Sequence, residues 1–293
     1  MELRQLEYFQ AVSRLNSVTR AADSLRVAQP SVTVAIRKLE EELGVVLIDR
    51  SQKQIALTAE GQVFLRHVDA ILGRVGDAAK EMNDYRLLKK GTIRVGIPPM
   101  VGAFMFPYVF AGFQKAHPWL ELSVIEHGSL AIHGQLERGG LDLGLVIISN
   151  VSPMLATTFI TSRQLLVCLP PAHPLAALPA VPFGQLRYEP FVMLKEDTYN
   201  RRLIMEECEK HGFTPRVVFS SSQIGTILGL VAQGVGLSFL LDAVVDGYPG
   251  VVARPLTEPL KIDIGLAWNK ERYLSKAARA FIDFIAATRP PSE

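Results

Sequence analysis

The spacing of apolar residues near the start of the chain is typical of helices. Leu6, Phe9 and Val12 mark the buried face of a first helix. Ser17 is a favourable N-cap residue, because its side-chain oxygen can accept a hydrogen bond from the first turn. A second helix is therefore expected to follow Ser17 and to continue through Leu25.

A third helix is predicted from near Pro30, which suits a first helical position, to Gly44, which ends it. Two short helices joined by a tight turn form the helix-turn-helix arrangement, which places a helix in the major groove of DNA. The alternative is a small helical core that binds no ligand. The apolar residues of the third helix, separated by steps of 4, 3 and 4, are Val32, Ile36, Leu39 and Leu43.

Two short strands are predicted next, in residues 45–50 and 54–57, on either side of a polar turn in residues 51–53. Such a pair forms a wing beside the helices. The wing favours DNA binding over a helical core without a ligand.

A long helix is predicted after Thr58, whose hydroxyl can cap it. Its apolar positions follow alternating steps of 4 and 3, which is typical of a helix that pairs with another in a coiled coil. The alternative is an amphipathic helix that lies on its own domain, although its apolar stripe is usually wider. The seam predicted for dimerisation consists of Phe64, Val68, Ile71, Val75, Ala78, Met82 and Tyr85.

Beyond Gly91 the pattern changes to strands that alternate with helices in βαβ units. Two α/β lobes, connected by polar crossovers near Ser162 and Lys261, are expected to leave a cleft at the carboxyl ends of their strands. The strands are predicted in residues 93–97, 122–125, 141–148, 165–169, 190–194, 216–219 and 236–241, with helices around residues 202–211 and 222–234.

The distribution of proline divides the chain. With 293 residues it exceeds a typical domain of about 100–200 residues. Pro30 is the only proline in residues 1–90, whereas the other seventeen of eighteen lie beyond Gly91, so a helical front precedes a looped α/β rear. The predicted domains are a DNA-binding domain (1–58), a linker helix (59–90) and an effector-binding domain (91–293), with one lobe at about 91–161 and 267–293 and the other at about 162–266.

Charge and cysteine content limit the possible functions. The net charge is +2, and residues 1–60 hold eight basic and eight acidic side chains, so DNA binding must depend on the helices. Cys168 and Cys208 have no neighbouring Cys or His at ligand spacing, so no disulfide framework, metal site or cofactor is expected. Charged first residues, and an apolar stretch (227–241) too short to cross a bilayer, predict a cytoplasmic protein without membrane contact.

Five short motifs in the front part, in this order and spacing, resemble the amino-terminal signature of LysR-type transcriptional regulators. Weaker motifs in residues 91–96, 141–145 and 233–237 extend the resemblance along the whole chain. The front motifs are Ala21-Ala22-Asp23-Ser24-Leu25, Gln29-Pro30-Ser31, residues 36–44, Leu47-Ile48-Asp49-Arg50 and Leu57-Thr58-Ala59-Glu60-Gly61.

The resemblance implies a fold and a function together. The implied fold is an α/β rear, a two-lobed periplasmic-binding-protein-like domain, preceded by a winged helix-turn-helix and a long linker helix that pairs two subunits. The implied function is regulation of transcription in response to a small-molecule effector. The partners are double-stranded promoter or operator DNA and further copies of the chain, as a homodimer and usually a tetramer.

Departures from the family's pattern fall at functional positions. Ala28 stands where the family often has Ser, so the third helix lacks a side-chain cap, usually worth about 0.5–2 kcal/mol. Val34 and Ala35 replace side chains that are commonly polar or basic. Pro99 and Met100 occupy a turn that often carries a hydroxyl.

The start of the third helix is predicted to read base edges. Gln29 is the first choice, because an amide can bond both N6 and N7 of adenine, while Val34 and the Thr33 methyl group can cover thymine methyl groups. The alternative for the basic residues is a solvated surface charge. The predicted base readers are Gln29, Pro30, Ser31, Thr33 and Val34, and the predicted contacts to the DNA backbone or minor groove are Arg37, Lys38, Arg50 and Lys53.

The effector is expected between the lobes, where strands end and helices begin. Amide groups at a helix start favour an anion, so a small, partly apolar acid is the expected effector. Arg201 and Arg202 are adjacent on a helix, so at most one of them faces the cleft. The predicted contacts are Pro99, Met100, His127 and Ser129 from one lobe and Thr198, Tyr199 and Ser222 from the other.

Two other classes of function compete with regulation. An enzyme is disfavoured, because the chain has no G-x-S-x-G, phosphate-loop or His-Glu-x-x-His motif, and residues 234–236 lack the third glycine of a dinucleotide fingerprint. A small-solute-binding protein without a gene-regulatory role is the stronger alternative, because two lobes suit it. That alternative gives no reason for the winged helix.

Overall fold

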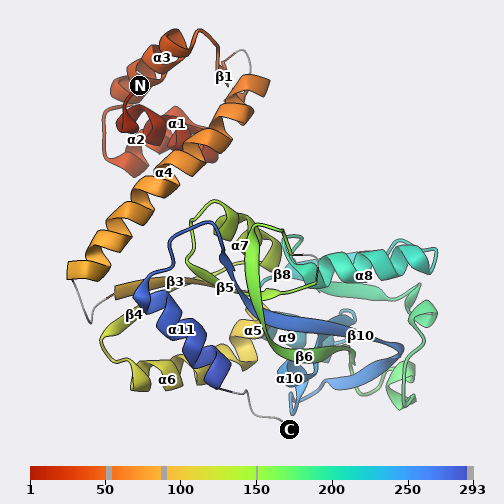
Figure 1. Cartoon of the computed structure of the whole chain (residues 1–293). Coiled ribbons are helices and arrows are strands. Elements are labelled where there is room, and N and C mark those ends of the chain that lie inside the picture. Colours follow the sequence, from red (N-terminus) through yellow and green to blue (C-terminus); the bar gives the residue numbers. More distant parts are fainter. Residues whose placement is uncertain (51–54, 87–90, 150, 289–293) are drawn as a thin grey trace. The chain divides into compact units, whose positions relative to one another are not determined.

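The chain folds into two compact units, Met1–Asn83 and Asp84–Glu293. The first is helical with a small hairpin, and the second is an α/β unit (Figure 1). The computed structural model describes residues 1–50, 55–86, 91–149 and 151–288.

The three predicted front helices are confirmed as α1 (Leu3–Leu15), α2 (Val18–Leu25) and α3 (Gln29–Leu43). Ser17 caps α2, since its side chain accepts a hydrogen bond from an amide of the first turn. Gly44 ends α3 with a φ of 69°, in the left-handed region that glycine adopts at little cost. The side chains that hold the three helices together include Leu6, Phe9, Val12, Ala21, Val32, Ile36 and Leu39.

The predicted wing is present but shorter than expected. β1 (Ile48–Asp49) pairs antiparallel with β2 (Ala56–Leu57). The turn predicted between the strands, which contains Lys53, lies outside the described residues.

The long helix α4 (Ala59–Arg86) begins at Thr58, as predicted. The Thr58 hydroxyl accepts a hydrogen bond from the amide of Gly61 at 2.9 Å and donates one to the carbonyl of Val46 at 2.7 Å. A Cβ at Gly61 would lie 2.0 Å from the carbonyl oxygen of Leu47. Glycine therefore allows the start of α4 to pack directly against the segment before β1.

A six-stranded sheet runs through the second unit in the order β4-β3-β5-β10-β6-β9. β3, β4 and β5 are parallel, whereas β10 is antiparallel to both of its neighbours. β7 and β8 form a separate parallel pair. The strand bounds are β3 Gly91–Ile97, β4 Leu120–Glu126, β5 Leu143–Ile147, β6 Leu155–Leu169, β7 Pro190–Leu194, β8 Arg216–Ser221, β9 Ser238–Leu241 and β10 Val252–Asn269.

The two longest strands, β6 and β10, connect the lobes. Ser162 pairs with Asp263, and Lys261 pairs with Gln164, so the two predicted crossovers lie side by side in one strand pair. Strand β10 was not predicted. It contains prolines that interrupt a strand pattern, and its register with β6 shifts beside Pro255.

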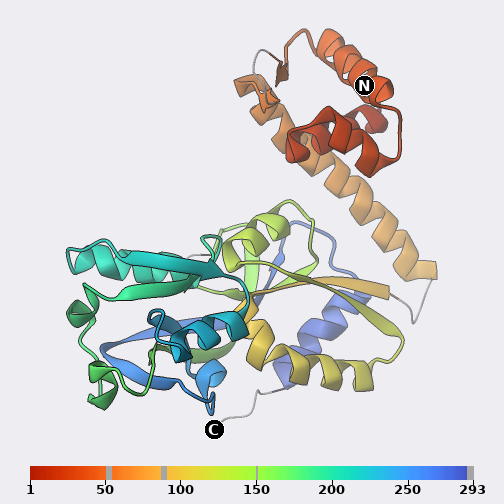
Figure 2. The same ribbon diagram turned by 180° about the vertical axis from the view of Figure 1, so that it is seen from behind.

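Helices cover both faces of the large sheet. Val146 of β5 belongs to the cluster under α7, while Leu145 belongs to the main core on the other face. On that other face α6 and α11 meet, and the rings of Phe113 and Phe281 lie 4.9 Å apart. Figure 2 shows α8 and α9 against the smaller sheet. The helix bounds are α5 Pro99–Phe104, α6 Phe106–Ala116, α7 Ser129–Glu137, α8 Tyr199–Lys210, α9 Ile224–Ala232, α10 Asp242–Val245 and α11 Lys276–Ala287, with short 3-10 helices at Pro174–Ala177 and Phe183–Leu186.

Candidate DNA interface and effector cavity

One face of α3 is buried and the opposite face is exposed. The apolar side chains at helical spacing point into the core of the first unit, which leaves the residues between them in solvent. Val34 lies on the exposed face with 51% of its surface accessible, an apolar side chain without an intramolecular packing role. The exposed residues among the predicted DNA contacts of α3 are Gln29, Pro30, Ser31, Val34, Arg37 and Lys38.

The first turn of α3 is held by its own side chains. The Thr19 hydroxyl donates a hydrogen bond to Gln29 Oε1 at 3.3 Å, which links α2 to the predicted base reader. Thr33 is half-buried, and its hydroxyl donates to the Gln29 carbonyl at 3.3 Å. Ala28 is the N-cap residue and makes no side-chain cap, as its identity predicts.

Glu40 organises the wing, a role that sequence reasoning missed. Its carboxylate is buried and accepts hydrogen bonds from the amides of Leu47 at 2.9 Å and Ile48 at 3.1 Å. Arg50, a predicted DNA contact, forms a 2.9 Å ion pair with the same carboxylate and keeps 41% of its side chain exposed. Glu40 therefore fixes the start of β1 and holds Arg50, which directly follows that strand.

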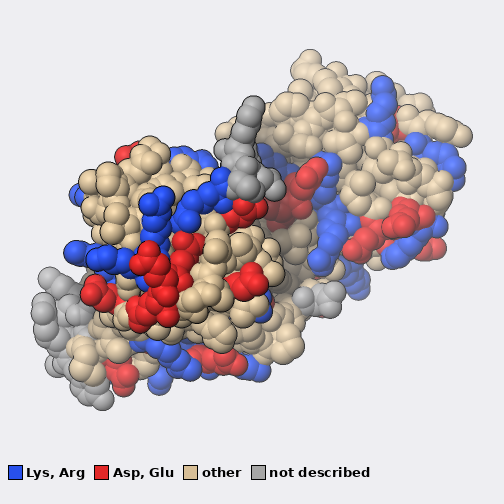
Figure 3. All heavy atoms as spheres, turned by 90° about the horizontal axis from the view of Figure 1, so that it is seen from above, with Lys and Arg blue, Asp and Glu red and all other residues tan. Residues whose placement is uncertain are grey.

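Charge on the surface is mixed. In the view of Figure 3, Lys and Arg side chains stand beside Asp and Glu side chains and do not form one continuous basic face. The net charge of the chain is only +2, so its overall field adds little affinity for DNA.

The apolar stripe of α4 has two parts. Phe64 packs on Phe9 with ring centroids 5.5 Å apart, and Val68 is fully buried in the same core. Val68 has no surface left for another subunit, so its place in the predicted seam is corrected: it holds α4 on its own domain, as the alternative interpretation states. Phe64 is half-buried in the same core and stays a predicted seam residue. The other seam residues lie further along α4. Ile71, Val75 and Met82 have 36%, 45% and 59% of their surfaces exposed, and Ala78 is exposed as well. The Tyr85 side chain lies outside the described part of the chain.

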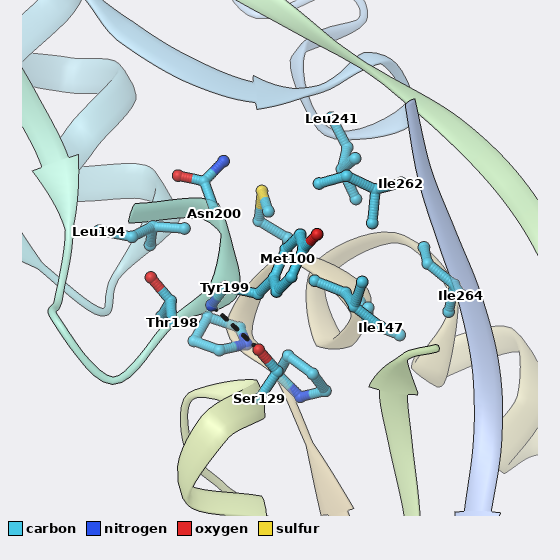
Figure 4. A pocket seen from close by; sticks show the side chains of 13 residues that line it. Met100, Ser129, Ile147, Leu194, Thr198, Tyr199, Asn200, Leu241, Ile262 and Ile264 are labelled. Carbon is cyan, nitrogen blue, oxygen red and sulfur yellow. Dashed lines mark hydrogen bonds between the residues drawn. The ribbon is translucent and has the colours of Figure 1, made fainter. Parts of the chain in front are cut away.

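A small apolar cavity lies between the lobes of the second unit (Figure 4). It encloses about 20 Å³, which is room for about one water molecule. None of the described residues that line it carries a charge. Five of the predicted effector contacts line this cavity, namely Pro99, Met100, Ser129, Thr198 and Tyr199.

The other two predicted contacts lie elsewhere. His127 is exposed and outside the cavity lining, because its position after a strand end does not fix the direction of its side chain. Ser222 lines a separate groove of about 330 Å³, next to Phe106 and Glu126. The lining residues that sequence reasoning missed are Pro98, Val101, Ile147, Leu194, Asn200, Leu241, Ile262 and Ile264, most of them apolar residues on strands.

Neither arginine at the start of α8 lines the cavity. Arg201 donates to Ser220 Oγ at 2.8 Å and lies 3.6 Å from a Glu196 carboxylate oxygen. Arg202 stacks over the Tyr199 ring at 4.9 Å. This agrees with the expectation that at most one of them faces the cleft. The polar groups of the cavity are therefore hydroxyls, an amide side chain and the backbone.

Both cysteines are buried, and burial raises the pKa of each thiol to about 12. A thiol of this kind is almost fully protonated at neutral pH and reacts slowly. Among the described residues there is no group of three His, Cys, Asp or Glu side chains that could hold a metal ion. Nor is any described helix long and apolar enough to span a bilayer.

A helix-turn-helix with a wing, followed by a long helix and a two-lobed α/β unit with an interlobe cavity, defines a ligand-responsive DNA-binding regulator. Family comparisons agree. "Bacterial regulatory helix-turn-helix protein, lysR family" matches residues 3–62, and "LysR substrate binding domain" matches residues 87–289. The chain belongs to the LysR family of transcriptional regulators, and it is a regulator and not an enzyme.

Individual relatives cover nearly the whole chain. An uncharacterized HTH-type transcriptional regulator, YwbI of Bacillus subtilis, is 34% identical over 97% of this chain and 95% of its own length. A hydrogen peroxide-inducible genes activator of Escherichia coli is 28% identical over 97% of this chain and 96% of its own length. The structure of full-length CbnR complexed with its target DNA has the same fold, with a TM-score of 0.64, 22% identity and coverage of 98% of this chain and 99% of that one.

Proposed function

We propose that the chain recognises specific operator sequences in promoter DNA through the exposed face of α3. The observation that carries this proposal is the arrangement of that face, where Gln29 and Val34 lie among exposed residues above a fully packed three-helix core. Gln29 bonds adenine, Val34 covers thymine methyl groups, and Arg37 and Lys38 contact phosphates. The similarity to CbnR, which was determined with its target DNA, supports this placement.

The second unit senses a small organic acid between its lobes. The interlobe cavity supports this site, since its apolar wall suits a hydrocarbon chain and α7 and α8 begin at its lining residues Ser129 and Tyr199. Binding that favours one arrangement of the lobes by about 1.4 kcal/mol would change the ratio of two regulator states tenfold. The alternative, a solute-binding protein without a gene-regulatory role, leaves the first unit unexplained.

The working form is a homodimer, assembled further into a tetramer on DNA. The exposed apolar residues of α4, Ile71, Val75 and Met82, support pairing of this helix with a second copy. Because the partner is DNA, we place the protein's action in the cytoplasm.

Two assays test the proposed function. A gel shift with the DNA upstream of the chain's own gene, against excess unrelated DNA, should give a specific complex that weakens with salt. Thermal shift with a panel of mono- and dicarboxylic acids should then identify an effector, and Ser129→Ala should weaken its binding while leaving DNA binding without effector intact. Ser123→Ala, a serine of the same lobe outside the cavity lining, is the matched control. Equal effector affinity in both variants contradicts the interlobe site.

A further inference from the structure

Two helices from different lobes begin opposite each other at the cavity. α7 starts at Ser129 in the first lobe, and α8 starts at Tyr199 in the second. The first amides of a helix have no partner within it and need an acceptor from elsewhere. The N-cap residue of α7 is Gly128, which offers no side-chain oxygen.

Each helix start is capped by the other lobe. The amide of Gly128 donates a hydrogen bond to Asp197 Oδ2 at 3.0 Å, and the amide of Leu130 donates to the Asp197 carbonyl at 3.2 Å. In the opposite direction, the amide of Tyr199 donates to Ser129 Oγ at 3.0 Å (Figure 4). Five residues therefore join the lobes through reciprocal caps.

Glycine at position 128 makes this close approach possible. A Cβ there would lie 2.2 Å from the carbonyl oxygen of Asp197 and 2.5 Å from its Cγ. The φ of Gly128 is −59°, which any residue adopts, so backbone conformation does not require glycine here. The contact between the lobes does.

The cavity beside these caps is too small for an effector. The cavity beside these caps encloses about 20 Å³, far less than the roughly 300–1,000 Å³ of a typical ligand pocket. The carboxylate of Asp197 already occupies the start of α7, where helix amides favour an anion.

We propose that Asp197 is an internal latch that holds the two lobes closed without an effector. Its carboxylate takes the position at α7 that an effector acid would claim, so the latch must open before the effector enters. Effector binding and the Asp197 contacts then exclude each other, and the two regulator states differ in which carboxylate caps α7. The inference rests on the proposed effector site.

Hydrogen–deuterium exchange of the full chain, followed by mass spectrometry, tests the latch. Two peptides are followed, one covering residues 126–132 and one containing the amide of Tyr199. In Asp197→Ala, exchange should rise at least about tenfold in both peptides. The substitution removes no acceptor of the Tyr199 amide, so faster exchange there reports separation of the lobes. Glu196→Ala removes an exposed carboxylate from the same loop and should leave both peptides at wild-type rates.

Gly128→Ala provides a second route to the open state with Asp197 intact. Its Cβ should force the lobes apart and raise exchange in the same two peptides. Gly134→Ala is the matched control on α7, because its Cβ meets only the flexible side chain of Arg138. Asp197→Asn keeps an acceptor oxygen without the charge and should give intermediate exchange.

Two results would overturn the latch. The first is faster exchange in Asp197→Ala confined to residues 126–132, which would make Asp197 a local cap. The second is wild-type exchange in Gly128→Ala. Failure of the gel shift would instead contradict the proposed DNA-binding function, and it would leave the exchange result unaffected.

Discussion

Replacing Glu40 with alanine should destabilise the first unit selectively. The change removes a buried carboxylate that accepts hydrogen bonds from two amides and pairs with Arg50. Each hydrogen bond to a charged group contributes about 1.5–3 kcal/mol, and a pair with a partly exposed arginine adds about 0–1 kcal/mol. The loss should total about 3–7 kcal/mol, since the amides of buried Leu47 and Ile48 lose their acceptor.

Urea unfolding followed with two probes separates the units. Both tryptophans, Trp119 and Trp268, lie in the second unit, so their fluorescence reports on it alone, while circular dichroism also reports on the helices of the first. In Glu40→Ala, the transition of the first unit should move at least about 1 M lower in urea, with the fluorescence transition unchanged.

Matched variants make the test of Glu40 specific. Glu41→Ala removes an exposed carboxylate next to it on α3 and should stay within about 0.5 kcal/mol of wild type. Glu40→Gln keeps an acceptor for the amides and should lose less stability than Glu40→Ala. If Glu40→Ala unfolded at the same urea concentration as Glu41→Ala, the wing would not depend on this carboxylate.

Three further predictions concern the seam, the thiols and pH. Ile71→Asp should dissociate the dimer, as measured by sedimentation. Val63→Asp, at an exposed position of α4 outside the apolar stripe, should leave the dimer intact. Equal sedimentation of the two variants would reject the predicted seam. Cys168 and Cys208 should resist a disulfide reagent until the chain is unfolded, and rapid labelling of the folded chain would contradict their burial. Burial on α7 lowers the pKa of His133 from its usual value of 6.5, so the unfolded chain protonates this imidazole more readily than the folded chain does. The free energy of unfolding should therefore fall as the pH drops below about 6.5. His133→Gln should lose less melting temperature than wild type between pH 8 and 5.5, and an equal loss would assign the effect to other groups.

Local patterns were sufficient to predict most elements. Ser17, Gly44 and Thr58 mark helix ends through their own backbone and side-chain chemistry, so α2, α3 and α4 were predicted close to their observed bounds. Strand β10 was missed because its pairing with β6 depends on residues far apart in the sequence, and because Pro255 interrupts the pattern.

The cavity was only partly predictable for the same reason. Turn residues such as Ser129 and Thr198 follow strand ends, and that position can be inferred from sequence. Ile262 and Ile264 reach the cavity only through the long-range register of β10, which no local pattern reveals. Glu40 was overlooked because an acidic residue on an amphipathic helix normally faces solvent.

The most direct test of DNA recognition compares three proteins on the DNA upstream of the chain's own gene. Wild type, Gln29→Ala and Arg37→Ala are titrated by fluorescence anisotropy against the operator and against unrelated DNA at several salt concentrations. Gln29→Ala should weaken operator binding by about 1–3 kcal/mol with nearly unchanged affinity for unrelated DNA, whereas Arg37→Ala should weaken both and reduce the salt slope by about one unit. Operator affinity of Gln29→Ala equal to that of wild type would contradict the assignment of α3 as the helix that reads DNA from this residue.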